Sequence, residues 1–273
     1  MIRAGLVALL LVCWGCSAAP AELDAQAPDP VARTPDASPH DGLSPDAVPP
    51  RDAASDGGAP FDLAVQDAQA VVPVAWLALG DSYTIGESVP AEGRWPVQLA
   101  ERLNAAGVPV RPPQIIARTG WSVAQLLAAV AAEDPRGPFA MVTLLIGVND
   151  QFRGGTAEAY TEAFTGALAE AIGRAGGRAC RVVVLSIPDY GYTPFGARDQ
   201  ARTSAALDAF NAINRAQTAA AGAHYVDVTP ISRRGLAEPA LVAADGLHPS
   251  TAQYAEWAAA ALPVAQEALR SCP

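Results

Sequence analysis

Lysine is absent from this sequence of 273 residues, so arginine supplies all of its permanent positive charge. The 18 arginines face 28 acidic residues, and the formal net charge is −10. No basic patch of the kind that binds nucleic acid is therefore predicted. We interpret the missing lysine as a compositional bias and not as a functional signal.

Patterns for metal and phosphate binding are also missing. No group of cysteine, histidine and acidic residues has the spacing of metal ligands, and no glycine-rich phosphate loop of a known pattern occurs. The sequence therefore predicts neither a metal ion nor another cofactor.

The N-terminal apolar run is short. Residues 4–14 follow the positively charged Arg3, and they are too few for a stable transmembrane anchor. This arrangement is typical of an export signal, which we assign to residues 1–16. The protein is therefore expected to be exported.

The end of this segment resembles the lipobox of bacterial lipoproteins, in which a cysteine becomes the lipidated first residue. Cys16 follows Gly15 directly behind the apolar run, although Cys13 stands where that motif usually has leucine. Lipidation of Cys16 would anchor the protein to a membrane of the cell envelope. Cleavage near Ala19 or Ala21 is the alternative, and it would give a periplasmic or secreted protein.

Residues 17–70 are rich in proline, alanine and aspartate and poor in large apolar side chains. Ten acidic and two basic residues give this segment −8 of the net charge, and residues 71–273 carry only −3. Such a composition buries too little apolar surface to offset the entropy of ordering. We predict a disordered tether over residues 17–70 and one folded domain over residues 71–273.

Apolar runs and helical periodicities alternate along the domain. This alternation predicts an α/β fold with a mostly parallel sheet covered on both faces. Strands are predicted at residues 71–79, 114–117, 139–146, 181–187 and 225–228, and helices at 91–106, 122–132, 156–175, 199–221 and 250–269.

Polar and glycine residues follow three of the predicted strands. They are residues 80–82, 119–120 and 147–150. Because ligands of parallel α/β sheets bind outside the carboxyl ends of the strands, a site is predicted at this edge.

Ser82 is the candidate nucleophile at that edge, and it needs a base. Of the three histidines, His40 lies in the tether and His224 at the opposite edge of the sheet, which leaves His248. Asp245 lies three residues before His248 and is placed to orient its ring. Taken singly, Asp245 is equally consistent with a turn or cap residue and His248 with a surface histidine.

An acyl-transfer reaction also needs donors for the developing oxyanion. The backbone N–H groups of Ser82 and Gly120 and the side-chain amide of Asn149 are the candidates. An ordinary turn glycine and a capping asparagine are the alternative interpretations.

Four sequence blocks together resemble those of the SGNH (GDSL-type) hydrolases, in the family's order. They are Gly80-Asp81-Ser82, Gly120, Gly147-Val148-Asn149-Asp150 and Asp245-Gly246-Leu247-His248. The resemblance implies a three-layer α/β/α sandwich around a five-stranded, flavodoxin-like sheet. It also implies ester hydrolysis through an acyl-enzyme, with Ser82, His248 and Asp245 as the triad and Ser82, Gly120 and Asn149 in the oxyanion hole.

The first block departs from the family at Tyr83, because the Gly-Asp-Ser-Leu motif that gives the family its name has leucine at this position. The Gly-x-Ser-x-Gly elbow of the α/β-hydrolases is absent around Ser82, which argues against that fold. A carbohydrate O-acetylesterase or a thioesterase of the same fold are alternatives within the enzymes. A surface-tethered binding domain without catalysis is the alternative from another class.

The expected substrate is a small-molecule or polymer ester. The absence of a long apolar lid or a carbohydrate-binding module in the sequence favours a short-chain ester. The loop at residues 188–196 is expected to face the substrate. Aromatic residues near the strand ends are expected to line the pocket or to pack beneath it: Tyr83, Trp121, Phe152, Tyr190, Tyr192 and Phe195.

Cys180 and Cys272 are both predicted at the sheet edge opposite Ser82, the first before a strand and the second after the last helix. A disulfide between them fits an exported protein. Two free thiols are the alternative.

Overall fold

The computed structural model describes residues 72–272. The predicted export signal, the lipidation at Cys16 and the tether lie outside the described residues. None of the described helices is long and apolar enough to cross a membrane.

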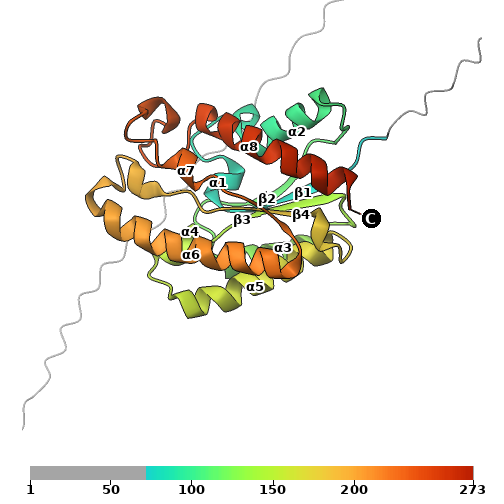
Figure 1. The fold of residues 1–273 in the computed structure, drawn as a ribbon, viewed down its shortest axis with the longest axis horizontal. Coiled ribbons are helices and arrows are strands. Elements are labelled where there is room, and N and C mark those ends of the chain that lie inside the picture. Colours follow the sequence, from blue (N-terminus) through green and yellow to red (C-terminus); the bar gives the residue numbers. More distant parts are fainter. Residues whose placement is uncertain (1–71, 273) are drawn as a thin grey trace, which may run out of the picture. The chain divides into compact units, whose positions relative to one another are not determined.

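Five parallel strands form a single sheet in the order β2-β1-β3-β4-β5. Figure 1 shows this sheet between the helices that cover it. Every residue of β1, β3 and β4 is buried, as expected for strands covered on both faces. The strands are β1 (Trp76–Gly80), β2 (Gln114–Ala117), β3 (Met141–Leu145), β4 (Val182–Leu185) and β5 (His224–Val226). The predicted parallel sheet is thus confirmed.

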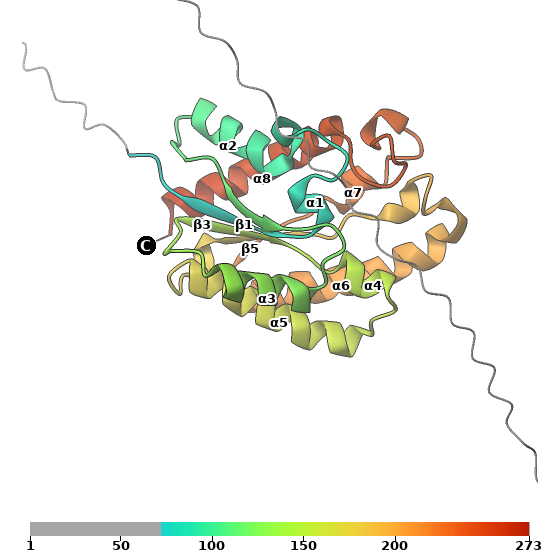
Figure 2. The same ribbon diagram turned by 180° about the vertical axis from the view of Figure 1, so that it is seen from behind.

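Helices cover both faces of the sheet, and Figure 2 shows the three layers from behind. One layer holds α1 (Ser82–Ile85), α2 (Trp95–Ala105), α7 (Thr229–Ser232) and α8 (Thr251–Arg270). The other holds α3 (Val123–Glu133), α4 (Val148–Phe152), α5 (Ala157–Arg174) and α6 (Gln200–Ala221). Short 3₁₀ turns are η1 (Ala91–Gly93), η2 (Ala179–Arg181), η3 (Tyr190–Tyr192), η4 (Ala197–Asp199) and η5 (Pro239–Leu241).

Between the sheet and the layer that holds α2 and α8, the core is formed by side chains that recur every four residues along each helix. Trp95, Leu99 and Leu103 of α2 are fully buried, and so are Trp257 and Ala261 of α8. Residues four apart lie on one face of a helix, so each helix turns one apolar stripe inward. The two stripes bring α2 and α8 together, and α8 packs along β3, β4 and β5.

The predicted continuous helix over residues 91–106 is wrong. The chain forms η1, becomes extended at Arg94 with φ −67° and ψ 137°, and then begins α2. Pro96 explains the interruption, because a proline has no N–H and is tolerated only in the first turn of a helix.

Strand β5 ends two residues earlier than predicted. The backbone N–H groups of Val228 and Thr229 donate to Ser186 Oγ at 2.8 and 3.0 Å. The side chain of Ser186 thereby turns the chain away from the sheet after Val226.

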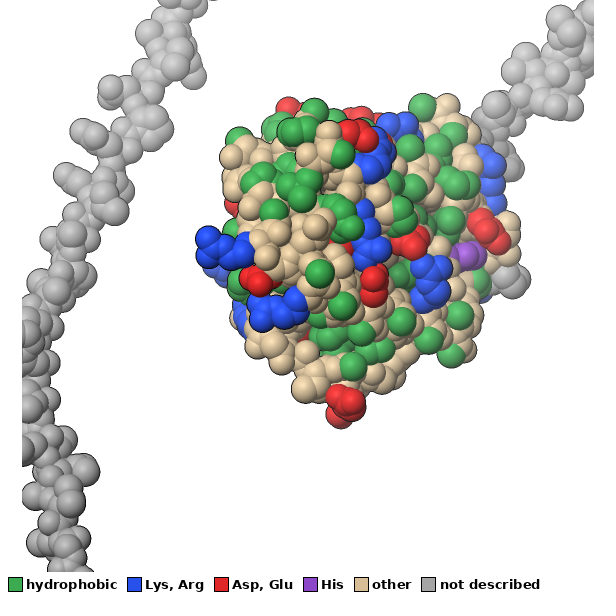
Figure 3. All heavy atoms as spheres, turned by 60° about the vertical axis from the view of Figure 1, so that its left-hand side comes forward, with side chains coloured by type: hydrophobic (Ala, Val, Ile, Leu, Met, Phe, Trp, Pro, Cys, Tyr) green, Lys and Arg blue, Asp and Glu red, His purple; other side chains and the backbone are tan. Residues whose placement is uncertain are grey.

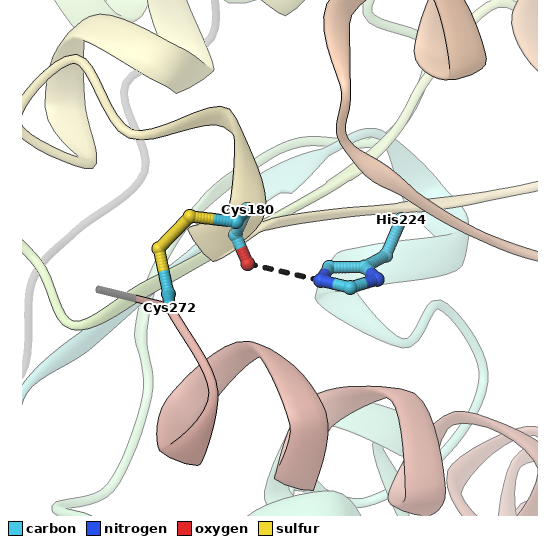
Figure 4. The surroundings of a disulfide bond; sticks show 3 residues. All are labelled: Cys180, His224 and Cys272. Atoms are coloured by element: carbon cyan, nitrogen blue, oxygen red, sulfur yellow. Dashed lines mark hydrogen bonds between the residues drawn. A yellow bond between two sulfur atoms is a disulfide. The ribbon is translucent and has the colours of Figure 1, made fainter.

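Cys180 and Cys272 are joined by a disulfide, with their Cα atoms 5.5 Å apart (Figure 4). The bond ties the end of α8 to the start of β4, at the amino ends of the strands. His224 lies beside it, with Nε2 3.0 Å from the Cys180 carbonyl oxygen. The ring of His224 therefore contacts the Cys180 carbonyl group at the edge of the sheet opposite Ser82.

Candidate active site at the carboxyl edge of the sheet

Ser82 is the first residue of α1, directly behind β1. The turn between them requires a glycine, because a Cβ on Gly80 would lie 2.2 Å from Thr84 Oγ1 and 2.5 Å from the Leu145 carbonyl oxygen. This close approach lets the strand pass into the helix within two residues. Ser82 is consequently held at the end of the strand, and only 5% of it is exposed.

Asp81 caps this helix from a fully buried position. Its Oδ1 accepts the Tyr83 N–H at 3.0 Å, whereas its Oδ2 has no partner among the described residues. Burial raises the pKa of the Asp81 carboxyl from 3.8 to about 8. Asp81 is therefore largely protonated at neutral pH in the folded protein.

Replacing Asp81 by asparagine should change how stability depends on pH. The folded state keeps the Asp81 proton up to about pH 8, whereas the unfolded chain releases it near 3.8, so this group destabilises the fold as pH rises between these values. An asparagine keeps the cap but does not titrate. Urea unfolding should show the Asp81→Asn variant gaining free energy of unfolding relative to wild type from pH 5 to pH 8. A difference that stays constant over this range would contradict the raised pKa.

His248 and Asp245 form a close pair before α8. His248 Nδ1 lies 2.6 Å from Asp245 Oδ2, and Asp245 Oδ1 accepts the N–H groups of Leu247 and His248, both at 2.9 Å. The turn thus holds both carboxylate oxygens in place. Because a carboxylate only accepts, this hydrogen bond assigns the proton to Nδ1 and leaves Nε2 as the basic nitrogen.

Ser88 also binds the Asp245 carboxylate, a contact that was not predicted from the sequence. Its Oγ donates to Asp245 Oδ2 at 2.6 Å, so this oxygen receives both Ser88 and His248. Partial burial raises the pKa of Asp245, but the bonds from Ser88, His248 and the Leu247 N–H outweigh it and hold that pKa far below its usual value. Ser88 has φ +66°, a conformation that is uncommon for a residue other than glycine and that tends to occur at functional sites.

Asn149 lies in the first turn of α4, behind β3. A Cβ on Gly147 would lie 2.3 Å from Tyr160 Oη, and Gly147 has φ +124°, so only glycine allows this strand-to-helix turn. Asn149 Nδ2 donates to the Trp121 carbonyl oxygen at 3.0 Å. One N–H of the amide thereby fixes the side chain, and the other remains for a ligand.

The loop that holds Gly120 is fastened to α4 by three side chains. Besides Asn149, Arg153 donates to the Gly120 carbonyl oxygen at 2.6 Å, and Asp150 Oδ2 accepts the Val123 N–H at 3.1 Å. Gly120 has φ +83°, which suits glycine. These contacts of Arg153 and Asp150 were not predicted from the sequence, because they depend on the short helix α4, which was not predicted either.

One cavity of about 170 Å³ brings most of the predicted site residues together. Its walls include Ser82, Asn149 and His248, with Val148 and Leu247 between them. Asp245 stands behind His248. Gly120 is not among the described residues that line the cavity, and it lies next to Trp121, the partner of Asn149.

Four of the six predicted aromatic residues line this cavity: Tyr83, Phe152, Tyr190 and Phe195. Tyr83 is buried, and its ring meets that of His248 edge-on at 5.8 Å. Trp121 packs against the core, and Tyr192 lies 6.0 Å from the Arg233 guanidinium. Tyr190 and Phe195 come from the loop at residues 188–196, which was expected to face the substrate.

Residues 78–256 match the profile of the GDSL-like Lipase/Acylhydrolase family. This range contains Ser82, Gly120, Asn149, Asp245 and His248. Comparison with curated proteins gives no significant match.

Solved structures of similar proteins share the fold. TesA, known from a crystal structure, is 21% identical in sequence with a TM-score of 0.57. The match covers 71% of this chain and 99% of the TesA chain. The lipase/acylhydrolase from Enterococcus faecalis is 21% identical with a TM-score of 0.55, covering 72% and 96%. Axe2, an acetylxylan esterase from Geobacillus stearothermophilus, is 20% identical with a TM-score of 0.55, covering 70% and 94%. On the strength of the family match over most of the folded domain, the chain belongs to the GDSL-like lipase/acylhydrolase family and is an ester-cleaving hydrolase.

Proposed function

We propose that the protein hydrolyses carboxylic esters of short acyl groups through an acyl-enzyme on Ser82. His248 Nε2 takes the Ser82 proton while Oγ forms a bond to the carbonyl carbon. The tetrahedral intermediate then breaks its bond to the alcohol, which leaves with the proton from His248. Water, deprotonated by His248, then attacks the acyl carbon and the bond to Ser82 Oγ breaks. His248 returns the proton to Oγ, and the acid is released.

The observation that carries this proposal is the hydrogen bond of 2.6 Å between His248 Nδ1 and Asp245 Oδ2, in a loop that lines the cavity at Ser82. It orients the ring so that Nε2 is the nitrogen free to act as a base. Asp245 also stabilises the imidazolium that forms. Activity of the Ser82 variant, described in the Discussion, is the direct test.

For the oxyanion we propose three donors: the N–H groups of Ser82 and Gly120 and the Asn149 amide. Asn149 supports this assignment because it lines the cavity while its other N–H is held by Trp121. Gly120 supports it because its carbonyl is fixed by Arg153, which orients the adjoining peptide.

Replacing Asn149 by alanine should lower kcat about 10²–10³-fold, since one oxyanion donor is lost in the transition state. The KM for a short ester should change much less. Steady-state kinetics with p-nitrophenyl acetate separates the two parameters. If KM rises while kcat stays the same, Asn149 serves substrate binding and not the oxyanion.

We infer that Ser88 is a positioning residue that acts through Asp245. Replacing it by alanine should lower kcat about tenfold, the size expected for a hydrogen bond to a charged group. Asp245 would then interact more strongly with the imidazolium, so the acidic limb of the pH profile of kcat/KM should move to higher pH.

Ser88→Gly is the matched variant, because glycine also lacks the hydroxyl but suits φ +66°. Both variants should show the same loss and the same shift of the acidic limb. A loss in Ser88→Ala that disappears in Ser88→Gly would assign the effect to the backbone.

We also propose that the protein is exported to the cell envelope and held there by a lipid on Cys16. The apolar run before Cys16 and the acidic tether behind it support this location. Radioactive palmitate should label the wild type and a Cys13→Ser variant in a bacterial host, but not Cys16→Ser. Equal labelling of both variants would reject Cys16 as the lipidated residue.

A further inference from the structure

A second and larger cavity adjoins the one at Ser82. It measures about 490 Å³ and lies between the end of α4, the loop at residues 188–196 and the start of α6. Phe152, Tyr190 and Phe195 line both cavities. We call it the aromatic-rimmed cavity. Its size is within the range of about 300–1,000 Å³ that small-molecule sites occupy, yet the acyl-transfer chemistry leaves it unused.

The shared rim exposes two phenylalanine rings to solvent. Phe152 is 59% exposed and Phe195 is 54% exposed, and their ring centroids lie 6.1 Å apart. Tyr190 joins them at 6.1 and 6.3 Å. A contiguous exposed apolar patch that is rimmed by polar residues is typical of a surface that binds a ligand or a partner. Their flat faces suit a ring better than a flexible chain.

The rest of the wall consists of four polar side chains, three glycines and one alanine. Gln151, Asp199, Arg202 and Thr203 contribute to it, and Ala206 is its one aliphatic residue among the described residues. A long acyl chain gains about 25 cal/mol for each Å² of apolar surface buried, and this wall offers little such surface beyond the rim. The composition therefore favours a ligand with many hydrogen-bonding groups.

Charge in the cavity is balanced. Arg202 and Asp199 form an ion pair with an N–O distance of 3.5 Å, and both side chains are exposed. On the face shown in Figure 3, acidic and basic side chains are likewise interspersed and not grouped by sign. A phosphate-bearing thioester carrier would need unpaired positive charge, so a neutral ligand fits better.

We propose that the aromatic-rimmed cavity holds the alcohol part of the ester, and that this alcohol is a neutral sugar ring. The smaller cavity at Ser82 then takes a short acyl group, so the substrate class is an O-acylated carbohydrate. This proposal rests on the proposed function of Ser82. In the reaction the bond between the acyl carbon and the sugar oxygen breaks, and the sugar hydroxyl leaves with the proton from His248.

Ala206→Trp tests this proposal, because the indole would fill the aromatic-rimmed cavity from α6 without belonging to the wall at Ser82. Ala205→Trp is the matched control, since Ala205 is exposed on the same helix and lines neither cavity. Three substrates are compared: an O-acetylated disaccharide, ethyl acetate, whose alcohol is too small to reach this cavity, and ethyl octanoate, which has the same alcohol and a long acyl chain. Circular dichroism checks that both variants are folded.

The wild type should prefer the disaccharide acetate to both other esters. The ratio of its kcat/KM to that of ethyl acetate should fall about tenfold or more in Ala206→Trp and stay the same in Ala205→Trp. An unchanged ratio in Ala206→Trp, or a wild type that prefers the octanoate, would overturn the sugar site. If Ser82→Ala is inactive on p-nitrophenyl acetate, either of these results contradicts the sugar site but not the proposed triad. If Ser82→Ala is active, the proposed function itself is rejected.

Discussion

Replacing Ser82 by alanine is expected to lower kcat/KM for p-nitrophenyl acetate by about 10⁴–10⁶-fold. Without the hydroxyl no acyl-enzyme forms, and His248 has only water to activate. The residual rate would come from oxyanion stabilisation and binding alone. Because Ser82 is small and lies at a helix start, alanine should fit without disturbing α1.

The assay separates an enzyme from a tethered binding domain. Ser271→Ala is a suitable control, since this serine is exposed beyond the end of α8, and it should keep the wild-type rate. A wild type that hydrolyses the ester no faster than Ser82→Ala would support the non-catalytic alternative. Trapping the acyl group on Ser82 by mass spectrometry would support the covalent step directly.

The second large effect is expected for Asp245→Asn, with a fall of kcat of about 10⁴-fold. The Asp245 Oδ1 position accepts two backbone N–H groups, so the amide oxygen should occupy it and the NH₂ should take the place of Oδ2. That NH₂ would face His248 Nδ1 and Ser88 Oγ, which both donate to Oδ2 in the wild type. The His248 proton would then move to Nε2, where a base is needed.

Asp134→Asn is a matched control for the loss of one negative charge. Asp134 is exposed at the end of α3 with φ +40°, a conformation that asparagine also tolerates. It should retain wild-type activity. Activity of Asp245→Asn within tenfold of wild type would show that the carboxylate is not needed to hold the Nδ1–H tautomer.

The α/β architecture could be predicted from local patterns. Continuous apolar runs mark strands that are buried on both faces, and helical periodicity marks the crossovers, so the parallel sheet follows from their alternation. The interruption at Arg94 was missed because a proline at residue 96 fits both a helix start and a helix break until neighbouring contacts are known. The short helix α4 was missed because five residues carry too little periodicity to detect.

The residues of the candidate site could also be predicted from the sequence. Elimination among three histidines left His248, and the structure places it on the same cavity as Ser82 and Asn149. Spacing of three residues between Asp245 and His248 suffices for their hydrogen bond, because one turn of the chain closes that distance. The sequence could predict that these residues lie close together, because the prediction concerns residue types at strand ends and contacts between near neighbours. Their catalytic roles stay a prediction.

By itself, the sequence determined the order of the strands and the longer helices, the edge at which polar groups gather, and the residues that we propose to carry the chemistry. Only the tertiary structure decided which distant loops meet there. Ser88 reaches Asp245 across 157 residues of chain, and the aromatic-rimmed cavity forms where α4, α6 and the loop at residues 188–196 pack together. Such contacts depend on the conformations and packing of irregular segments, which hydrophobic periodicity does not encode.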